Sequence, residues 1–200
     1  MCVTKTLAVK SRKETRSNST KMPVTAVSRT KPNILITGTP GTGKSSLCKQ
    51  LAEKTGYEWL EVSKLAKDWE CISDYDEEYD TSVLDEDKLL DTMEPIMANG
   101  GKIVDYHGCD FFPERWFNIV FVLRTDNTIL YDRLSERGYT GKKLSDNVEC
   151  EIFQTLLEEA KSSYDEDIVH ELQSSTLAEA ASNLERIVSW TDQWTKDNTS

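Results

Sequence analysis

A glycine-rich octapeptide near the start of the chain constrains the fold more than any other feature. Residues 38–45 read GTPGTGKS and match the phosphate-binding loop pattern G-x-x-x-x-G-K-[ST] at every fixed position. The loop follows an apolar run over residues 33–37, typical of a buried strand, and precedes an amphipathic stretch over residues 46–54, typical of a helix. In such a unit, backbone N–H groups and the helix N-terminus converge on phosphate oxygens. The sequence therefore predicts a site for a nucleoside triphosphate.

Different residues of this loop are expected to bind different parts of the nucleotide. Glycines allow the backbone to approach the phosphates closely, and the Lys44 side chain is expected to reach the β- and γ-phosphates. The Ser45 hydroxyl is expected to bind Mg²⁺. The predicted nucleotide-binding set is Gly41, Thr42, Gly43, Lys44, Ser45 and Ser46.

The remainder of the chain alternates apolar runs with helical patterns. Strands are predicted at residues 58–62, 102–105, 118–123 and 167–172, and helices at residues 63–68, 85–99, 130–137, 145–163 and 177–194. Because the strands are nearly all apolar, we predict an α/β fold whose parallel sheet is covered by helices on both faces. Its ligand then binds beyond the carboxyl ends of the strands. The acidic and aromatic segment 74–80 shows no clear periodicity and is expected to form a solvated flap.

Composition limits the class of protein. Two hundred residues suit one α/β domain. No segment approaches the roughly 18 to 20 apolar residues that a membrane span requires. The five cysteines are scattered, and none forms a C-x-x-C pair. This pattern argues against a zinc site or a disulfide framework and favours a reducing compartment.

Charge is distributed unevenly along the chain. Residues 1–31 contain eight basic residues and one acidic residue, a net charge of +7, so the total of −11 leaves −18 for residues 32–200. A globular part this acidic repels a phosphate backbone, so we expect no general nucleic-acid binding and favour a basic protein partner. Residues 1–31 lack apolar periodicity and are expected to form a disordered basic tail. The alternatives are a mitochondrial transit peptide, a nuclear or partner-binding segment, or a stretch that translation from Met22 makes dispensable.

Two polar side chains beyond the loop are expected at the triphosphate. Asp105 ends the predicted strand 102–105, and a carboxylate at a strand end beside a phosphate loop provides the hard oxygen that Mg²⁺ requires. His107 follows two residues later, at the mouth of the predicted site. Its role is expected to be either catalytic, orienting water, or structural.

Phosphoryl transfer also requires cations, because charge spreads over the oxygens of the transferred group. Arg133 and Arg137 are four residues apart, so they share a helix face near the break at Gly138. They are either nucleotide ligands or ordinary surface arginines. The other cations near the site are Lys142 and Lys143, which close the same loop, and Arg115 and Arg124, weaker candidates near strand ends.

Four segments together resemble one known family. They are residues 38–45, 75–80 (YDEEYD), 105–117 (DYHGCDFFPERWF) and 137–144 (RGYTGKKL). They resemble the nuclear adenylate kinase-like ATPases, also called adenylate kinase isoenzyme 6 or coilin-interacting nuclear ATPase proteins. That family includes a factor for maturation of the small ribosomal subunit. The resemblance covers residues 32–196 and excludes the basic tail.

The resemblance implies a nucleoside monophosphate kinase fold around a five-stranded parallel sheet. It also implies adenylate kinase activity, in which ATP and AMP give two ADP, with ATPase activity alongside. Residues 61–84 would be the monophosphate-binding arm and residues 136–146 the lid over ATP. Arg137 matches the ATP-contacting lid arginine of the family, and Asp105 and His107 match its extended Mg²⁺-binding motif.

The chain departs from the family pattern at several positions. Lys67 stands where these proteins usually present an arginine to the AMP phosphate, which keeps the charge but loses the bidentate fork. Lys64 replaces a usual acidic residue, and residues 174–176 (SST) lack the Asn-Lys-Pro expected beside the adenine. Compared with ordinary adenylate kinases, the lid is short and the arginines usually found beyond it are missing. These departures bear on AMP binding more than on ATP binding.

Together with the residues of the site, the resemblance implies a monomeric, Mg²⁺-dependent ATP:AMP phosphotransferase with ATPase activity, acting on ribosome maturation in the nucleus and also the cytoplasm. AMP is the expected acceptor, with CMP and dAMP as alternatives, and a basic small-subunit ribosomal protein is the expected partner. One rival function is an ATP-driven assembly factor with incidental kinase activity, and another is a mitochondrial or cytosolic metabolic kinase. The predicted catalytic residues are Lys44, Asp105, His107 and Arg137, and the predicted substrate-binding residues are Lys67 and Arg133.

Overall fold

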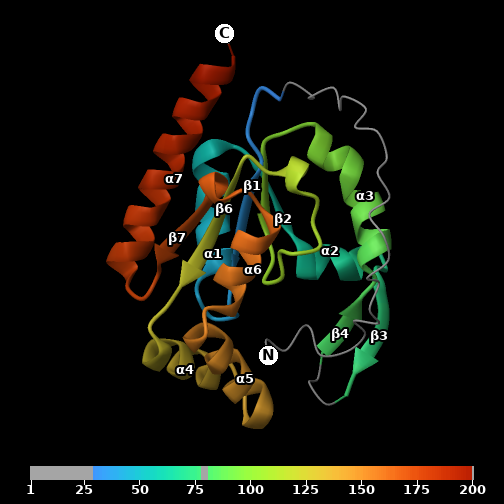
Figure 1. Ribbon diagram of the computed structural model, residues 1–200, viewed down its shortest axis with the longest axis vertical. Helices are drawn as coiled ribbons and strands as arrows, with labels where there is room; N and C mark the ends of the chain where they lie inside the picture. Colours follow the sequence, from blue (N-terminus) through green and yellow to red (C-terminus); the bar gives the residue numbers. More distant parts are fainter. Residues whose placement is uncertain (1–28, 78–80, 200) are drawn as a thin grey trace.

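A five-stranded parallel sheet forms the centre of the protein (Figure 1). The structure, a computed structural model, describes residues 29–77 and 81–199. The strand order is β2-β5-β1-β6-β7. These strands are Ile34–Gly38 (β1), Glu58–Glu61 (β2), Lys102–Asp105 (β5), Ile119–Arg124 (β6) and Val169–Gln173 (β7). The predicted α/β fold and its parallel sheet are confirmed.

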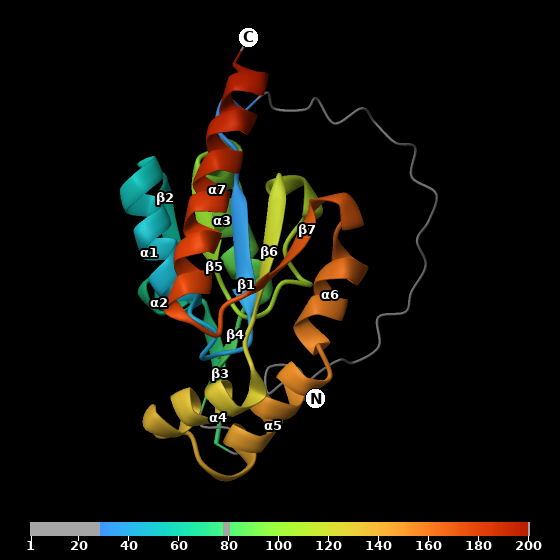
Figure 2. The ribbon, with the colours of Figure 1, turned by 90° about the vertical axis from the view of Figure 1, so that its left-hand side faces the viewer.

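Helices cover both faces of this sheet, as the apolar strands predicted. Helices α1 and α7 contribute to the apolar cluster on one face, and α2, α3 and α6 contribute to the cluster on the other (Figure 2). Ile34 and Ile36 of β1 belong to the first cluster, whereas Leu35 belongs to the second. The helices are Lys44–Thr55 (α1), Val62–Asp68 (α2), Glu86–Ala98 (α3), Asn127–Glu136 (α4), Gly141–Ile152 (α5), Thr155–Ser163 (α6) and Leu177–Asn198 (α7).

The register of the sheet brings the ends of β1, β5 and β6 together. Ile36 pairs with Asp105, and Gly38 pairs with Leu123. Because the strands are parallel, their carboxyl ends meet at one edge, where residues 38–45 leave β1. This edge is the lower one in Figure 1, with α4 and α5 at one side and the β3–β4 hairpin at the other.

One predicted helix is wrong, because the stretch expected as a single helix over residues 145–163 forms two. Gln154 adopts a left-handed φ of 56° at the junction between α5 and α6. The break redirects the chain, so that α5 lies beyond the end of the sheet and α6 packs against it (Figures 1 and 2). Periodicity does not reveal the break, since Cys150 and Leu157 on its two sides keep the spacing of one continuous helix face.

The acidic segment expected as an irregular flap is a β-hairpin. Ile72–Asp76 (β3) pairs antiparallel with Thr81–Leu84 (β4), and residues 78–80 between them lie outside the described part of the chain. Neighbouring side chains Ser73, Asp74 and Tyr75 are all exposed. An apolar alternation that would predict these strands is therefore absent from the sequence.

Several element boundaries also differ from the prediction. Helix α1 begins at the loop lysine rather than two residues later, and α4 begins at Asn127 rather than at residue 130. The Asp126 side chain explains the second shift, because it accepts hydrogen bonds from the amides of Thr128 and Ile129 and so caps the helix. Strand β7 begins at Val169, after the 3-10 turn Glu166–Ile168; another such turn, Glu114–Trp116, precedes β6.

The structure can be compared with the expectations for cysteines, metal sites, membrane spans and the N-terminal tail. Cys48, Cys71, Cys109 and Cys150 are buried, and none of them is joined in a disulfide. Over residues 29–77 and 81–199, no cluster of three or more acidic, histidine or cysteine side chains is arranged to hold a metal ion. None of the described helices is long and apolar enough to cross a membrane. The tail prediction covers residues 1–31, of which residues 1–28 lie outside the described part. Arg29 is described, and it donates hydrogen bonds to the carbonyls of Trp116 and Arg115 at 3.0 and 3.1 Å.

Candidate nucleotide-binding site

The predicted phosphate-binding loop wraps around the N-terminus of α1. Gly41 and Gly43 have φ angles of 97° and 98°, a backbone conformation that residues other than glycine rarely adopt. Gly43 is the N-cap residue, and no side chain caps the first amides of the helix. These amides are therefore available to an anion, which the helix dipole also favours. The Lys44 ammonium lies over the loop, donating to the carbonyls of Gly38 at 2.7 Å and Thr39 at 3.1 Å.

Two cavities meet at this loop. The first, of about 480 Å³, extends from the loop toward the end of β5 and the N-terminal half of α5. The second, of about 470 Å³, extends toward α4 and the loop between β7 and α7. Both are lined by Gly41, Gly43, Ser46 and Arg137. An elongated ligand with its phosphates on the loop can therefore occupy both cavities.

Asp105 and Ser45 line the first cavity together, as the sequence predicted for a magnesium site. The Asp105 side chain is only 4% exposed, and its Oδ2 atom has no hydrogen-bond partner among the described residues. A buried carboxylate oxygen without a partner is costly. A hydrated Mg²⁺ would satisfy this oxygen, and one carboxylate plus nucleotide phosphates is an ordinary donor set for that ion. These residues therefore fit the ion.

His107 also lines the first cavity. Its carbonyl accepts a hydrogen bond of 2.9 Å from the Thr37 hydroxyl, which ties this segment to β1. Burial, and secondarily the charge of Lys44, lowers the pKa of His107 to about 3. The imidazole is therefore neutral at physiological pH, and its Nε2 atom has no hydrogen-bond partner among the described residues.

The two arginines predicted at the phosphates occupy different positions. Arg137 is exposed and lines both cavities together with residues of the phosphate loop. Arg133 lines only the second cavity, and it donates to the carbonyls of Gly41, Ser174 and Ser175 at 3.3, 3.2 and 2.8 Å. Arg133 thus joins the phosphate loop to the β7–α7 loop, while its predicted substrate contact stays a prediction.

The predicted acceptor residue lies apart from both cavity linings. Lys67 is an exposed residue in the last turn of α2, and it lines neither of these two cavities. The predicted monophosphate-binding arm, residues 61–84, does reach the first cavity at its start, where Glu61 and Ser63 form part of the cavity wall. AMP phosphate binding by Lys67 stays a prediction.

The remaining predicted cations are distributed over several positions. Lys143 lines the first cavity, whereas Lys142 is exposed and outside both linings. Arg115 forms an ion pair of 2.5 Å with Glu94. Arg124 forms ion pairs of 2.7 Å with Glu151 and 3.4 Å with Glu171. Neither Arg115 nor Arg124 lines either of these two cavities.

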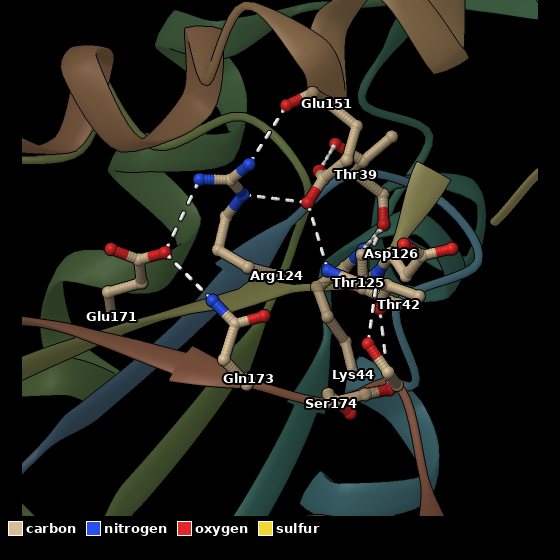
Figure 3. A network of polar contacts seen from close by, with 11 residues as sticks. Thr39, Thr42, Lys44, Arg124, Thr125, Asp126, Glu151, Glu171, Gln173 and Ser174 are labelled. Atoms are coloured by element: carbon tan, nitrogen blue, oxygen red, sulfur yellow. Dashed lines mark hydrogen bonds and ion pairs between the residues drawn. The ribbon is translucent and has the colours of Figure 1, made fainter. Parts of the chain in front are cut away.

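Sequence reasoning missed the residues that hold the loop from behind. Glu151, near the end of α5, accepts hydrogen bonds from the Thr39 hydroxyl and from Arg124 (Figure 3). Sequence reasoning also missed Asn147 and Tyr139, which form part of the wall of the first cavity. A signal was present, since Lys143, Asn147 and Glu151 recur every four residues and so predict one polar helix face.

The site and the fold together define a P-loop kinase, in which a phosphate-binding loop at the end of a parallel sheet shares a cavity with the cationic side chains of Arg137 and Lys143. A family model described as an AAA domain matches residues 34–154. The chain is 57% identical to an adenylate kinase isoenzyme 6 homologue of Drosophila melanogaster, over 82% of this chain and 94% of that protein. It is 54% identical to the homologue of Caenorhabditis elegans, over 88% and 97%. The chain therefore belongs to the family of adenylate kinase isoenzyme 6 homologues.

A solved structure supports the fold. Shikimate kinase from Acinetobacter baumannii, in complex with shikimate, superposes with a TM-score of 0.54, covering 80% of this chain and 92% of that one. Its sequence is only 14% identical, so the likeness concerns the fold alone. The family resemblance drawn from the sequence is confirmed, and the protein is a nucleotide kinase of the adenylate kinase type.

Proposed function

We propose that the protein transfers the γ-phosphoryl group of ATP to AMP, giving two ADP, and that it also hydrolyses ATP. The observation that carries this proposal is the shared cavity wall formed by Lys44, Asp105 and Arg137. One cation at the loop, an unpaired carboxylate and a second cation at the lid are the groups that a triphosphate and its Mg²⁺ require. The names of the relatives support AMP as the acceptor.

In this mechanism the protein mainly positions its substrates. The N-terminal amides of α1 and the Lys44 ammonium hold the β- and γ-phosphates, and Arg137 neutralises charge on the transferred group. A phosphate oxygen of AMP attacks the γ-phosphorus, and the bond to the β–γ bridging oxygen breaks, with its electron pair leaving on ADP. The nucleophile is already an anion, so the transfer needs alignment more than a strong base.

Mg²⁺ would be held by Asp105 and the Ser45 hydroxyl, and when bound it supplies positive charge to the phosphate oxygens. The acceptor would lie in the first cavity between the phosphate loop and the segment containing Glu61 and Ser63. Lys67 would complete its phosphate site if α2 and the hairpin move toward the cavity when AMP binds. Such closure is common in kinases of small molecules.

Hydrolysis is proposed as a second activity because of His107. Its imidazole is neutral and its Nε2 atom has no hydrogen-bond partner among the described residues, at the wall of the cavity that would hold the γ-phosphate. A neutral imidazole nitrogen can accept a hydrogen bond from water and orient it toward phosphorus. Water would then replace AMP as the nucleophile.

We further propose a role in maturation of the small ribosomal subunit, in the nucleus and the cytoplasm, with the protein acting as a monomer. The family resemblance suggests this role, and the net charge of −18 over residues 32–200 favours a basic ribosomal protein as partner. An assembly factor with incidental kinase activity is the second candidate, because that same charge supports it. A mitochondrial location would instead favour a metabolic kinase.

Product analysis tests the enzymatic proposal. The protein is incubated with Mg²⁺ and ATP alone, and then with AMP, CMP or dAMP added, and the nucleotides are separated by ion exchange. We expect slow formation of ADP and inorganic phosphate from ATP alone, and much faster formation of ADP when AMP is present. An ADP yield that none of the monophosphates increases would refute the kinase assignment.

A further inference from the structure

A buried carboxylate joins helix α5 to the phosphate loop. Glu151 lies in the last turns of α5, and its side chain is only 2% exposed. Its Oε2 atom accepts a hydrogen bond of 2.6 Å from the Thr39 hydroxyl. Its Oε1 atom accepts from Arg124 Nε at 2.7 Å and from the Thr125 amide at 2.9 Å (Figure 3). Three donors thus fix one carboxylate at the meeting point of α5, β6 and the loop after β1.

The same helix forms part of the nucleotide cavity. Lys143 and Asn147 of α5 line the first cavity, and Glu151 follows at the same four-residue spacing on that face. The Asn147 side-chain amide donates a hydrogen bond of 2.6 Å to the Lys143 carbonyl within the helix. A displacement of the anchored end of α5 would therefore displace the cavity wall.

Thr39 connects this anchor to the catalytic lysine. Its side chain is bound by Glu151, and its carbonyl accepts from the Lys44 ammonium at 3.1 Å and from the Thr42 hydroxyl at 2.9 Å. Thr39 is 1% exposed, so water cannot readily replace a lost partner. The conformation of the loop is consequently fixed on one side by Glu151 and on the other by Lys44.

We propose that Glu151 is a positioning residue, which holds the phosphate loop and helix α5 in the relative arrangement that binds the nucleotide. The proposal rests on the proposed function, because it assigns Glu151 to the same site. It differs from a general contribution to stability, since it acts through Thr39. Glu151 touches neither of the two cavities and is not a catalytic residue.

Thr39→Val is the most selective test. Valine keeps the branched shape and the volume of threonine but removes the hydroxyl, while Arg124 and Thr125 continue to bind Glu151. Glu151→Gln is the second variant, because a carboxamide offers one acceptor oxygen where three donors converge. Two exposed glutamates provide matched controls. Glu149→Gln lies on the same helix, and Glu171→Gln removes the 3.4 Å ion pair with Arg124 at a residue that also accepts a hydrogen bond from Gln173.

The measurement is the Kd of the full-length protein for a fluorescent ADP analogue, together with the thermal unfolding midpoint of each variant. We expect Thr39→Val to weaken binding about tenfold, the loss expected from one charge-assisted hydrogen bond, and to remain folded. The two controls should bind like the wild type. Glu151→Gln should also weaken binding. In the double variant Thr39→Val/Glu151→Gln, the loss of affinity should be smaller than the product of the losses in the two single variants, since both substitutions act through one contact.

Two results would overturn the inference. One is a Kd of Thr39→Val within about twofold of the wild type, a change smaller than one hydrogen bond to a charged group produces. The other is a double variant Thr39→Val/Glu151→Gln whose loss of affinity equals the product of the losses in the two single variants. Failure of the wild type to bind the nucleotide would overturn the proposed function as well, so the two failures are distinguishable.

Discussion

The side of the cavity that we propose as the donor site and the side that we propose as the acceptor site differ in how firmly they are held. On the donor side, the phosphate loop is bound from two neighbouring elements, by Glu151 of α5 at the Thr39 hydroxyl and by Arg133 of α4 at the Gly41 carbonyl. On the acceptor side, α2 exposes Lys67, which lines neither cavity.

The β3–β4 hairpin, next to α2, is also loosely attached. It forms a separate two-stranded sheet, with a register shift between Ile72 and Asp74. Tyr75 of the hairpin is 52% exposed, so little apolar surface holds it against the remainder of the protein. Segments with few buried contacts are the ones that move most readily on binding.

We infer that the donor site exists before ligands bind and that the acceptor site is completed when AMP binds. A preformed site loses less conformational entropy on binding than one that must be ordered. Substitutions on the donor side should therefore affect every reaction of the protein. Substitutions on the acceptor side should affect only the reaction that uses AMP.

Lys44→Ala should have the largest effect and reduce both phosphoryl transfer and hydrolysis. The ammonium neutralises the β- and γ-phosphates in both reactions, so its loss should lower both turnover rates by on the order of 10²-fold or more. A coupled assay for ADP measures transfer, and phosphate release measures hydrolysis. Lys49→Ala, an exposed position on the same helix, is the matched control. A folded Lys44→Ala protein with near-normal turnover would contradict the donor site.

His107→Gly should have a smaller and unequal effect. Water requires orientation whereas AMP is already an anionic nucleophile, so hydrolysis should fall by up to about 10²-fold and transfer by less. The two assays are run on the same preparation. His170→Gly, at the other histidine of the chain, is the control because its side chain is exposed on β7. Equal losses in both reactions would instead indicate a structural or substrate-positioning role.

Lys67→Ala should have the most restricted effect. If Lys67 binds the AMP phosphate, its loss should raise the KM for AMP about tenfold, as expected for one charged contact, and spare hydrolysis measured without AMP. Lys67→Arg should match or improve the wild type, since a guanidinium can bind two oxygens. Lys161→Ala on α6 controls for the change in net charge. An unchanged KM would place the acceptor phosphate elsewhere.

The donor side was also the side that the sequence could predict. The loop, the strand before it and the helix after it are contiguous, so the local pattern specifies the site, and the register of β1 and β5 then places Asp105 beside it. The hairpin escaped prediction because its exposed side chains leave no apolar alternation. Glu151 escaped prediction, and so did the bond from Arg133 to the loop, because these contacts join residues more than 90 positions apart, Glu151 to Thr39 and Arg133 to Gly41.

The fate of the γ-phosphoryl group in a single turnover tests the central claim most directly. Excess protein is mixed with Mg²⁺, AMP and ATP labelled in its γ-phosphate, the reaction is stopped with acid, and the products are separated. We predict that most of the label appears in the β-phosphate of ADP formed from AMP, with a minor part in inorganic phosphate. Label found only in inorganic phosphate, with AMP returned unchanged, would contradict the account.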